Sequence, residues 1–360
     1  MGKASSRNFK SETKAVRKKT SAKNDGEPDS PTSAEIAANL SDAGFQRERP
    51  LAAPYAMKQQ RAKRDRERST LPPSPGGVQI LRSELLSQLP WLVHGFSTRQ
   101  AGVTAEYGGN QMNLGVTKED TRENVSRNRE IFLRALGAES RGKAWPTVQM
   151  HQIHSAIIHR VSKAEPHPAN GDGLITDEAG LVVGVRIADC IPVVAVDRKR
   201  RVLGVFHAGW RGTVQRIVQK GIGEMRRQFG CDPKDIFVAI GPGIGVCCYQ
   251  VGDEVIEQFR SQFAYADELI EEVFDSHSLH AKYPLLFLNQ RAPGHGEPPK
   301  VPHLNLMQAN LIQAIDAGVP ANNIDSLNLC TACRTDIFFS HRKEHITGRM
   351  MAAAAIKPNR

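Results

Sequence analysis

Short apolar runs separated by glycine-containing turns are the feature that most constrains how this chain can fold. From Val78 onward these runs have the length of β-strands, and they alternate with longer stretches of helical period. The predicted strands are residues 93–97, 156–161, 173–176, 181–186, 192–197, 202–207 and 236–240. The predicted helices are residues 122–136, 214–229, 253–263 and 305–317. Strands and helices mixed in this way predict an α/β fold.

Residues 1–75 differ in composition from the rest of the chain. They are rich in Ser, Lys, Arg and Pro, have few aromatic residues, and contain 16 Lys or Arg against nine Asp or Glu. Such a segment cannot bury enough apolar area to order itself, so we expect a disordered basic tail over 1–75 and a folded domain over 76–360. Residues 57–68 could form a basic helix against RNA or an acidic surface, but a solubilising tail is the simpler interpretation.

The charge of the remaining 285 residues is close to balanced, with 32 Lys or Arg against 29 Asp or Glu. No basic stripe is visible there, so we expect no nucleic-acid partner except through the tail. No run approaches the roughly 18 to 20 apolar residues of a membrane span, and Met1 to Arg17 lacks the apolar segment of a secretory signal. The six cysteines are too sparse for a disulfide framework. We therefore expect reduced thiols, no membrane partner and a cytoplasmic location. Separately, residues 275–302 contain much Pro, Gly and His and are expected to form an irregular surface excursion.

Three segments concentrate side chains that bind metals: His151-Gln-Ile-His154, Ala188-Asp-Cys190 and Phe206-His-Ala-Gly-Trp-Arg-Gly212. Each is predicted at a strand end or in the following turn, where residues distant in sequence can meet at one sheet edge. Two imidazole nitrogens and one thiolate suit zinc, and three protein ligands leave a fourth position for water or substrate. Taken singly, each residue is more often a hydrogen-bonded core residue, and His151 and His154 would lie on opposite faces of an extended segment. We expect only one of those two histidines to be a ligand.

The motifs as a set resemble a known family. They are Gln152-Ile-His154, Gly171-Asp-Gly-Leu-Ile-Thr176, Ala188-Asp-Cys-Ile-Pro192, His207-Ala-Gly-Trp-Arg-Gly212, Gly241-Pro-Gly-Ile-Gly245 with Cys248-Tyr-Gln-Val-Gly252, and Cys330-Thr331 with Phe339-Ser340, Arg342 and Thr347-Gly-Arg349. This order resembles the purine nucleoside phosphorylase family formerly called multicopper polyphenol oxidoreductases or laccases, which includes the YfiH, YlmD and laccase-domain proteins. The resemblance runs from about His94 to the C-terminus.

The resemblance implies a single-domain α/β sandwich with a mixed sheet and one zinc ion per chain, held by His154, Cys190 and His207. It also implies an enzyme that splits adenosine, inosine, guanosine and S-methyl-5'-thioadenosine with phosphate, yielding base and ribose 1-phosphate, and that deaminates adenosine. Purine nucleosides and phosphate are then the expected partners. A zinc-bound water and phosphate-holding cations suit that pair of reactions.

Four residues besides the metal ligands complete the expected site. Arg211 and Arg99 are the candidate phosphate-binding cations, and Arg211 could equally be a surface arginine beside a helix. Asp172 and Asp189 could orient a histidine ligand or accept a ribose hydroxyl, or else cap turns. Cys190 and His207 would also take part in catalysis. Two positions depart from the family pattern: Asn305 replaces an aspartate at a helix start, and Lys343 replaces an arginine that could bind an anion bidentately.

Three alternatives remain open from the residues. A copper-dependent polyphenol oxidase would need many paired histidines, but His277, His280, His295, His303, His341 and His345 are scattered. A hydrolase could use Cys190 as a nucleophile activated by His207. An RNA-binding adaptor would act through the basic tail.

The pairs Cys247-Cys248 and Cys330-Thr-Ala-Cys333 allow a redox role, but a thioredoxin-like context is lacking and packing or reduced thiols are favoured. The sequence sets no oligomeric state.

Overall fold

A six-stranded sheet contains most of the strands predicted from the apolar runs. The computed structural model describes residues 77–162, 169–274 and 300–358. The strand order of this sheet is β15-β12-β10-β11-β8-β7. Its strands are β7 (Ile158–Arg160), β8 (Gly173–Thr176), β10 (Ile191–Asp197), β11 (Val202–Ala208), β12 (Ile236–Ile240) and β15 (Ile324–Ser326). The central strands β10, β11 and β12 are buried along their whole length, which is why they read as continuous apolar runs.

A five-stranded sheet packs against the first and has the order β1-β2-β16-β9-β6. Its strands are β1 (Ile80–Leu81), β2 (Leu92–Ser97), β6 (Thr147–Val148), β9 (Val182–Ile187) and β16 (Met350–Ile356). The middle strand β16 has the sequence Met-Met-Ala-Ala-Ala-Ala-Ile and was not among the predicted strands. Alanine favours helices, so the extended form depends on antiparallel pairing with β2 and β9 on its two sides.

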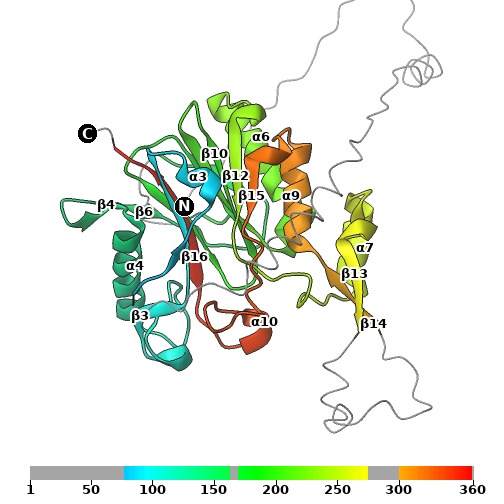
Figure 1. Cartoon of the computed structure of the whole chain (residues 1–360), viewed down its shortest axis with the longest axis horizontal. Coiled ribbons are helices and arrows are strands. Elements are labelled where there is room, and N and C mark those ends of the chain that lie inside the picture. The colour runs from blue at the N-terminus through cyan, green and yellow to red at the C-terminus, as the bar shows by residue number, and fades with distance from the viewer. Residues whose placement is uncertain (1–76, 163–168, 275–299, 359–360) are drawn as a thin grey trace, which may run out of the picture. The chain divides into compact units, whose positions relative to one another are not determined.

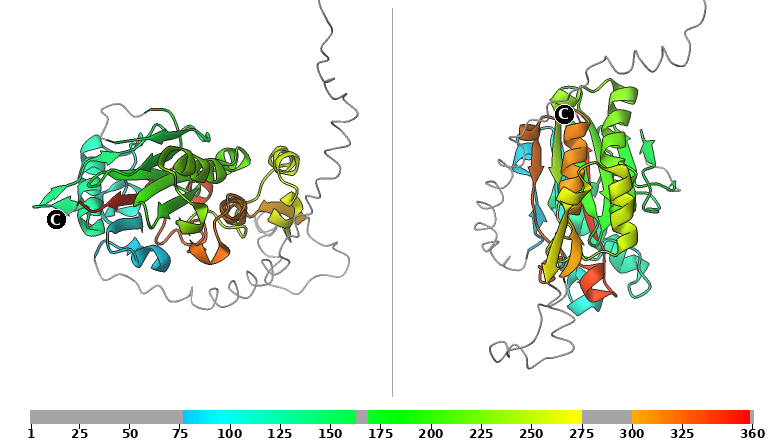
Figure 2. Two further views of the ribbon diagram at one scale, coloured as in Figure 1. Left: turned by 90° about the horizontal axis from the view of Figure 1, so that it is seen from above. Right: turned by 90° about the vertical axis from the view of Figure 1, so that its right-hand side faces the viewer.

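The sheets and helices form four layers. Between the sheets, Val194 and Val205 pack in one core cluster with Val183 and Ala352. Helices α6 (Ile217–Phe229) and α9 (Leu306–Asp316) cover the outer face of the six-stranded sheet, where they lie side by side (Figures 1 and 2). Helix α4 (Arg122–Leu136) packs on the outer face of the other sheet (Figure 1). Parallel and antiparallel pairs occur in both sheets, so the predicted mixed α/β sandwich is confirmed.

The remaining elements are short or peripheral. The helices are α3 (Glu84–Ser87), α5 (Trp210–Val214), α7 (Asp253–Gln262) and α10 (His341–Glu344), with 3-10 turns η2 (Glu106–Gly108), η3 (Pro233–Asp235), η4 (Ala266–Leu269) and η5 (Ala321–Asn323). The strands are β3 (Gln100–Thr104), β4 (Glu139–Ser140), β5 (Lys143–Ala144), β13 (Ile270–Phe274) and β14 (Lys300–Leu304).

Most predicted bounds agree with the structure to within about two residues, with two corrections. The helix predicted over 214–229 is divided, because Arg216 adopts a left-handed conformation (φ 64°) between α5 and α6. The excursion predicted over 275–302 is wrong at its end, where residues 300–302 belong to β14 and pair with β13. The departure at Asn305 preserves the helix start, since its side chain accepts a hydrogen bond from the Gln308 N–H at 3.0 Å.

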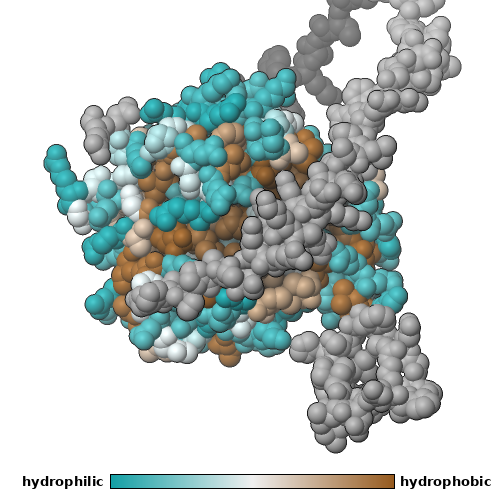
Figure 3. Space-filling view, in the orientation of Figure 1, coloured by the Kyte–Doolittle hydropathy of each residue, from teal (hydrophilic) through white to brown (hydrophobic). Residues whose placement is uncertain are grey.

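The tail predicted over 1–75 and residues 275–299 lie outside the described residues. None of the helices in the described ranges combines the length and apolar character needed to cross a bilayer. On the face drawn in Figure 3, hydrophobic residues form a band across the middle and hydrophilic residues gather above and below it.

Two glycines of α6 test the packing of this helix on the sheet. A Cβ on Gly221 would overlap the ring of Phe206 in β11, whereas a Cβ on Gly223 would meet nothing within 4 Å. We expect Gly221→Ala to lower the free energy of unfolding by about 1 to 3 kcal/mol through overpacking. The matched control Gly223→Ala should raise it by about 0.5 to 1 kcal/mol through helix propensity. Urea unfolding measures both, and equal effects at the two positions would contradict the packing described.

Candidate metal centre

The antiparallel pairing of β10 and β11 places Cys190 beside His207. In this register Ile191 lies opposite Ala208, and Pro192 lies opposite His207. Cys190 is the residue directly before β10, and His207 is near the end of β11. The strand ends therefore meet as the sequence predicted, although the two residues belong to different motifs.

His154 reaches the same place from the loop before β7. Its backbone is left-handed (φ 59°), and its ring lies edge-on to the His207 ring with centroids 5.0 Å apart. One donor atom each from His154, Cys190 and His207 lies within 4.8 Å of the other two. His151, the other histidine of the motif, is exposed and is not part of this group. The structure thus brings His154, the histidine that the resemblance implied, together with the other two donors.

A glycine allows the three donors to come this close. A Cβ on Gly209 would lie 3.0 Å from Cys190 Sγ and 3.0 Å from His154 Cδ2. His207 is buried, Cys190 is half-buried and His154 is exposed, so the group faces solvent on one side only. Two imidazoles, one thiolate and an open side match a zinc site with a free coordination position, so the residues present fit a zinc ion.

Asp172 connects the loop of His154 with the ring of His207 through hydrogen bonds. This fully buried carboxylate accepts the backbone N–H groups of residues 153–155 at 2.6 to 3.2 Å and the Ser155 hydroxyl at 2.8 Å. Its Oδ1 atom also lies 2.8 Å from His207 Nδ1. With Nδ1 engaged, Nε2 is the ring nitrogen of His207 that remains for a metal. Asp172 therefore orients a histidine, one of the roles expected of it.

Neighbouring charges and hydrogen bonds shift the pKa values of Cys190, His207 and Asp172. Burial opposes ionisation of Cys190, but the charge of His207 and hydrogen bonds from His154 and His207 lower the pKa of the thiol to about 6. Burial likewise opposes protonation of His207, but the Cys190 thiolate and Asp172 raise the pKa of the imidazole to about 9. Hydrogen bonds from His207 and Ser155 outweigh burial and lower the pKa of Asp172 to about 2. The chain thus stabilises a thiolate at neutral pH, which is the form that binds metals.

The side chains of Asp189 and Arg99 form hydrogen bonds to other parts of the fold than Asp172 does. The two oxygens of Asp189 accept the Thr331 hydroxyl and the Arg342 backbone N–H, each at 2.6 Å. The buried guanidinium of Arg99 donates to Gln111, Glu344 and three backbone carbonyls, at 2.6 to 3.2 Å. Both side chains therefore join segments that are distant in sequence.

Arg211 has the exposure that Arg99 lacks. It lies in α5, two residues after Gly209, and its guanidinium stacks on the Trp210 ring at 4.2 Å from the centroid.

Tyr249 also borders the site and was not among the predicted site residues. Burial and the charge of Cys190 raise the pKa of its hydroxyl, and Arg211 and Arg342 oppose that shift. Arg342 lies over the Tyr249 ring at 5.2 Å. Tyr249 lies in the motif Cys248-Tyr-Gln-Val-Gly252, and Arg342 follows Phe339-Ser340. These motifs are the only sequence feature that could have pointed to the two residues.

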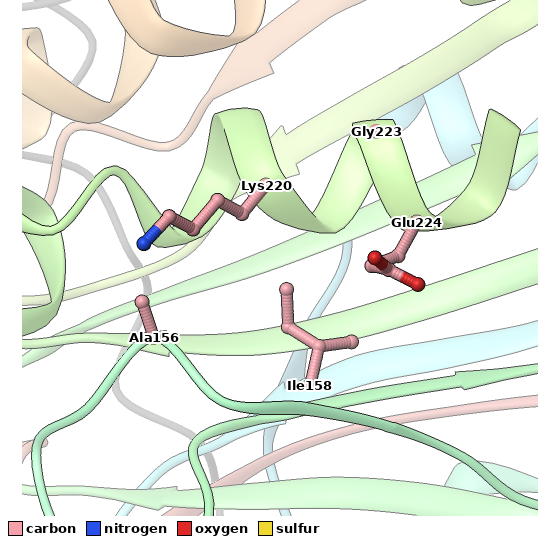
Figure 4. Close-up of a pocket in the computed structure, with 5 residues that line it drawn as sticks. All are labelled: Ala156, Ile158, Lys220, Gly223 and Glu224. Atoms are coloured by element: carbon pink, nitrogen blue, oxygen red, sulfur yellow. The ribbon is translucent and has the colours of Figure 1, made fainter. Parts of the chain in front are cut away.

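A surface pocket of about 440 Å³ lies between α6 and the start of β7. Figure 4 shows the Lys220 side chain extending toward Ala156, with Ile158 between it and the carboxylate of Glu224. The donor atoms of the metal-binding group do not line this pocket. The candidate centre is therefore assigned from its side-chain chemistry and not from the pocket.

Known proteins show the same sequence pattern and fold. Residues 93–357 match the family described as multi-copper polyphenol oxidoreductase laccase. Purine nucleoside phosphorylase YlmD of Geobacillus stearothermophilus is 33% identical over 275 residues, covering 71% of this chain and 90% of that protein. Adenosine deaminase RL5, from an unknown prokaryotic organism, is 32% identical over 257 residues, covering 70% of this chain and 88% of that protein.

The crystal structure of the Bacillus licheniformis hypothetical protein YfiH superposes with a TM-score of 0.65 at 28% identity. The superposition covers 79% of this chain and 98% of that structure. The matched range starts at the second residue of β2 and ends just after β16, so it includes strands of both sheets. The chain therefore belongs to the multi-copper polyphenol oxidoreductase laccase family, whose relatives include proteins named purine nucleoside phosphorylase, as the sequence motifs predicted.

Proposed function

We propose that this chain is a zinc-dependent purine nucleoside phosphorylase that also deaminates adenosine. The observation that carries the proposal is the group of His154, Cys190 and His207, with donor atoms within 4.8 Å and one side open to solvent. The names of the relatives YlmD and RL5 supply the two reactions. The proposed substrates are adenosine, inosine, guanosine and S-methyl-5'-thioadenosine, with phosphate as the second substrate.

The residues around the centre have separable tasks in this proposal. A zinc ion held by the three donors would supply a Lewis acid and a water of near-neutral pKa. Asp172 fixes the orientation of His207 and keeps its Nδ1 engaged, and Cys190 contributes a thiolate. The buried carboxylate cannot reach a substrate without losing its hydrogen bonds to residues 153–155, so its task is positioning.

Phosphate needs a cation with free access. Arg211 is exposed and lies in α5, the short helix that follows the strand of His207. We therefore assign phosphate binding to it. Arg99 was the second candidate, but its guanidinium already donates to Glu344 and to backbone carbonyls, which favours a structural task. Arg342, which lies over the Tyr249 ring, is a second cation that acts on Tyr249 together with Arg211. The exposed Lys343 follows Arg342 in α10.

A second candidate function has one observation in its favour. The paired Cys190 thiol and His207 imidazole have the shifted pKa values of a nucleophile and its base, which would suit a cysteine hydrolase without metal. The open side and the second histidine favour zinc instead. A copper oxidase would need further histidine groups, and in the described ranges the grouped metal-ligating side chains are this centre and a cluster of cysteines.

Substitution of His154 tests the metal-dependent reaction. His154→Asn keeps a residue that tolerates the left-handed backbone but is too short to replace the imidazole. We expect the variant to lose one zinc ion per chain and its phosphate-dependent release of base from adenosine and inosine to fall at least about a hundredfold. Metal analysis and chromatography of the free bases measure the two effects.

His151→Asn is the matched control, because His151 is exposed in the same loop and outside the group. It should keep the zinc content and the activity of the wild type. Copper in place of zinc, or full activity in His154→Asn, would contradict the proposal.

Alkylation separates zinc ligation from a nucleophilic role for Cys190. In the metal-free protein, the rate of Cys190 labelling by iodoacetamide should rise with pH through about 6, because the thiolate is the reactive form. Saturating zinc should slow that labelling strongly. Peptide mass mapping follows Cys190 itself, and equal rates with and without zinc would favour the nucleophile.

Asp172→Asn tests the positioning of His207. The amide has one fewer acceptor atom for its donors, so the loop and the imidazole should lose their fixed orientation. We expect zinc affinity to fall about 10- to 100-fold, as measured by competition with a chromogenic chelator. Asp177→Asn is the control, since Asp177 is an exposed partner of Arg160. An unchanged zinc affinity in Asp172→Asn would remove Asp172 from the site.

A further inference from the structure

Four cysteines outside the candidate metal centre come together from two distant segments. Cys247 and Cys248 lie in the loop after β12, and Cys330 and Cys333 lie in the segment after β15. The two segments run side by side: the Gly243 N–H donates to the Leu329 carbonyl at 3.1 Å, and the Thr331 N–H donates to the Gly243 carbonyl at 3.0 Å. The fold therefore fixes the approach of the two cysteine pairs through the backbone.

The sulfur atoms have the spacing of a single metal site. All four Sγ atoms lie within 4.8 Å of one another, and those of Cys247 and Cys248 are each 3.4 Å from Cys333 Sγ. A tetrahedral zinc ion with Zn–S bonds of about 2.3 Å separates its sulfur ligands by about 3.8 Å. A disulfide would need about 2.05 Å, and each one would join only two of the four thiols.

The backbone around the cysteines also matches a metal site. The Gly245 N–H donates to Cys330 Sγ at 3.2 Å, and the Cys333 N–H reaches the same sulfur. Such N–H···S bonds orient and stabilise thiolate ligands. A Cβ on Gly245 would lie 3.1 Å from Cys330 Cβ and 3.2 Å from Cys247 Sγ, so glycine keeps the two segments close.

We propose that Cys247, Cys248, Cys330 and Cys333 bind a second, structural zinc ion. Four thiolates complete a tetrahedral shell, so the site has no open position for a substrate. Tetrahedral sulfur also suits an iron–sulfur cluster, but bridging sulfides between several irons would hold the thiolates further apart than they lie here. The spacing therefore favours one ion.

The position of this second site explains what it would stabilise. Thr331, next to Cys330, donates its hydroxyl to Asp189, and the Ile244 N–H donates to the Asp189 carbonyl at 2.7 Å. Asp189 directly precedes Cys190 of the candidate metal centre. A zinc ion between the two cysteine segments would lock both sides of Asp189 and so support the placement of Cys190 from a distance.

The test uses the full chain and compares substitutions in the two sites. Cys190→Ser weakens the first site, so the zinc retained by this variant should be the second ion. Cys247→Ser/Cys333→Ser should lose one zinc ion per chain while its His154 site still binds zinc. The triple variant should retain almost none. Cys231→Ala is the thiol control, because Cys231 is a core cysteine outside both groups.

Two readouts on Cys190→Ser do not require the cysteine cluster to be altered, and so remain valid if the double variant fails to fold. Replacing zinc with cobalt should give the intense visible bands of a tetrahedral tetrathiolate. Zinc should also protect Cys247 and Cys333 from iodoacetamide, although both are exposed, and a chelator should abolish the protection.

The outcomes are distinct. A second zinc ion, a tetrathiolate spectrum and chelator-sensitive protection would support the site. Unprotected thiols at saturating zinc, a Cys247 to Cys333 disulfide in protein purified without oxidant, or iron with sulfide would overturn it. Since these measurements are made without the first site, loss of the phosphorylase proposal would leave them unaffected.

Discussion

The buried carboxylate of Asp172 is the constraint on which the candidate metal centre depends. A charge removed from water must be compensated by hydrogen bonds, and Asp172 receives them from residues 153–155 and from His207. The same bonds join the loop that carries His154 to the strand that carries His207. One acid thereby sets the positions of two metal donors that are 53 residues apart in the chain.

The sheets supply the rigidity that this arrangement needs. Cys190 is placed by the pairing of β10 with β11, and β11 is packed between the second sheet and α6. A shift of one residue in this register would turn every buried side chain of β11 to the opposite face, so the apolar core also fixes where His207 lies. Gly209 then provides the space in which His154 and Cys190 approach each other.

Asp189 connects the centre to the cysteine cluster. Its side chain accepts from Thr331 and Arg342, and its carbonyl accepts from Ile244. A residue in a left-handed conformation (φ 91°) needs such support, because this conformation is strained for any residue except glycine. The two segments that carry the four cysteines provide it, which gives the cluster a structural connection to the centre without a contact to the metal donors.

Strands and helices with strong apolar periodicity could be predicted from the residue pattern, because that pattern shows which faces are buried. The sequence also determined which three motifs carry metal-binding side chains. Other features depend on tertiary contacts: the alanine-rich β16 is extended because strands lie on both sides of it. The motifs pointed to His154, but its place beside His207 depends on the buried Asp172, which fixes its loop. Arg99 shows the same limit. Its guanidinium is used by residues 335, 338 and 344, more than 230 positions away, and no local pattern can reveal how distant backbone carbonyls occupy a side chain.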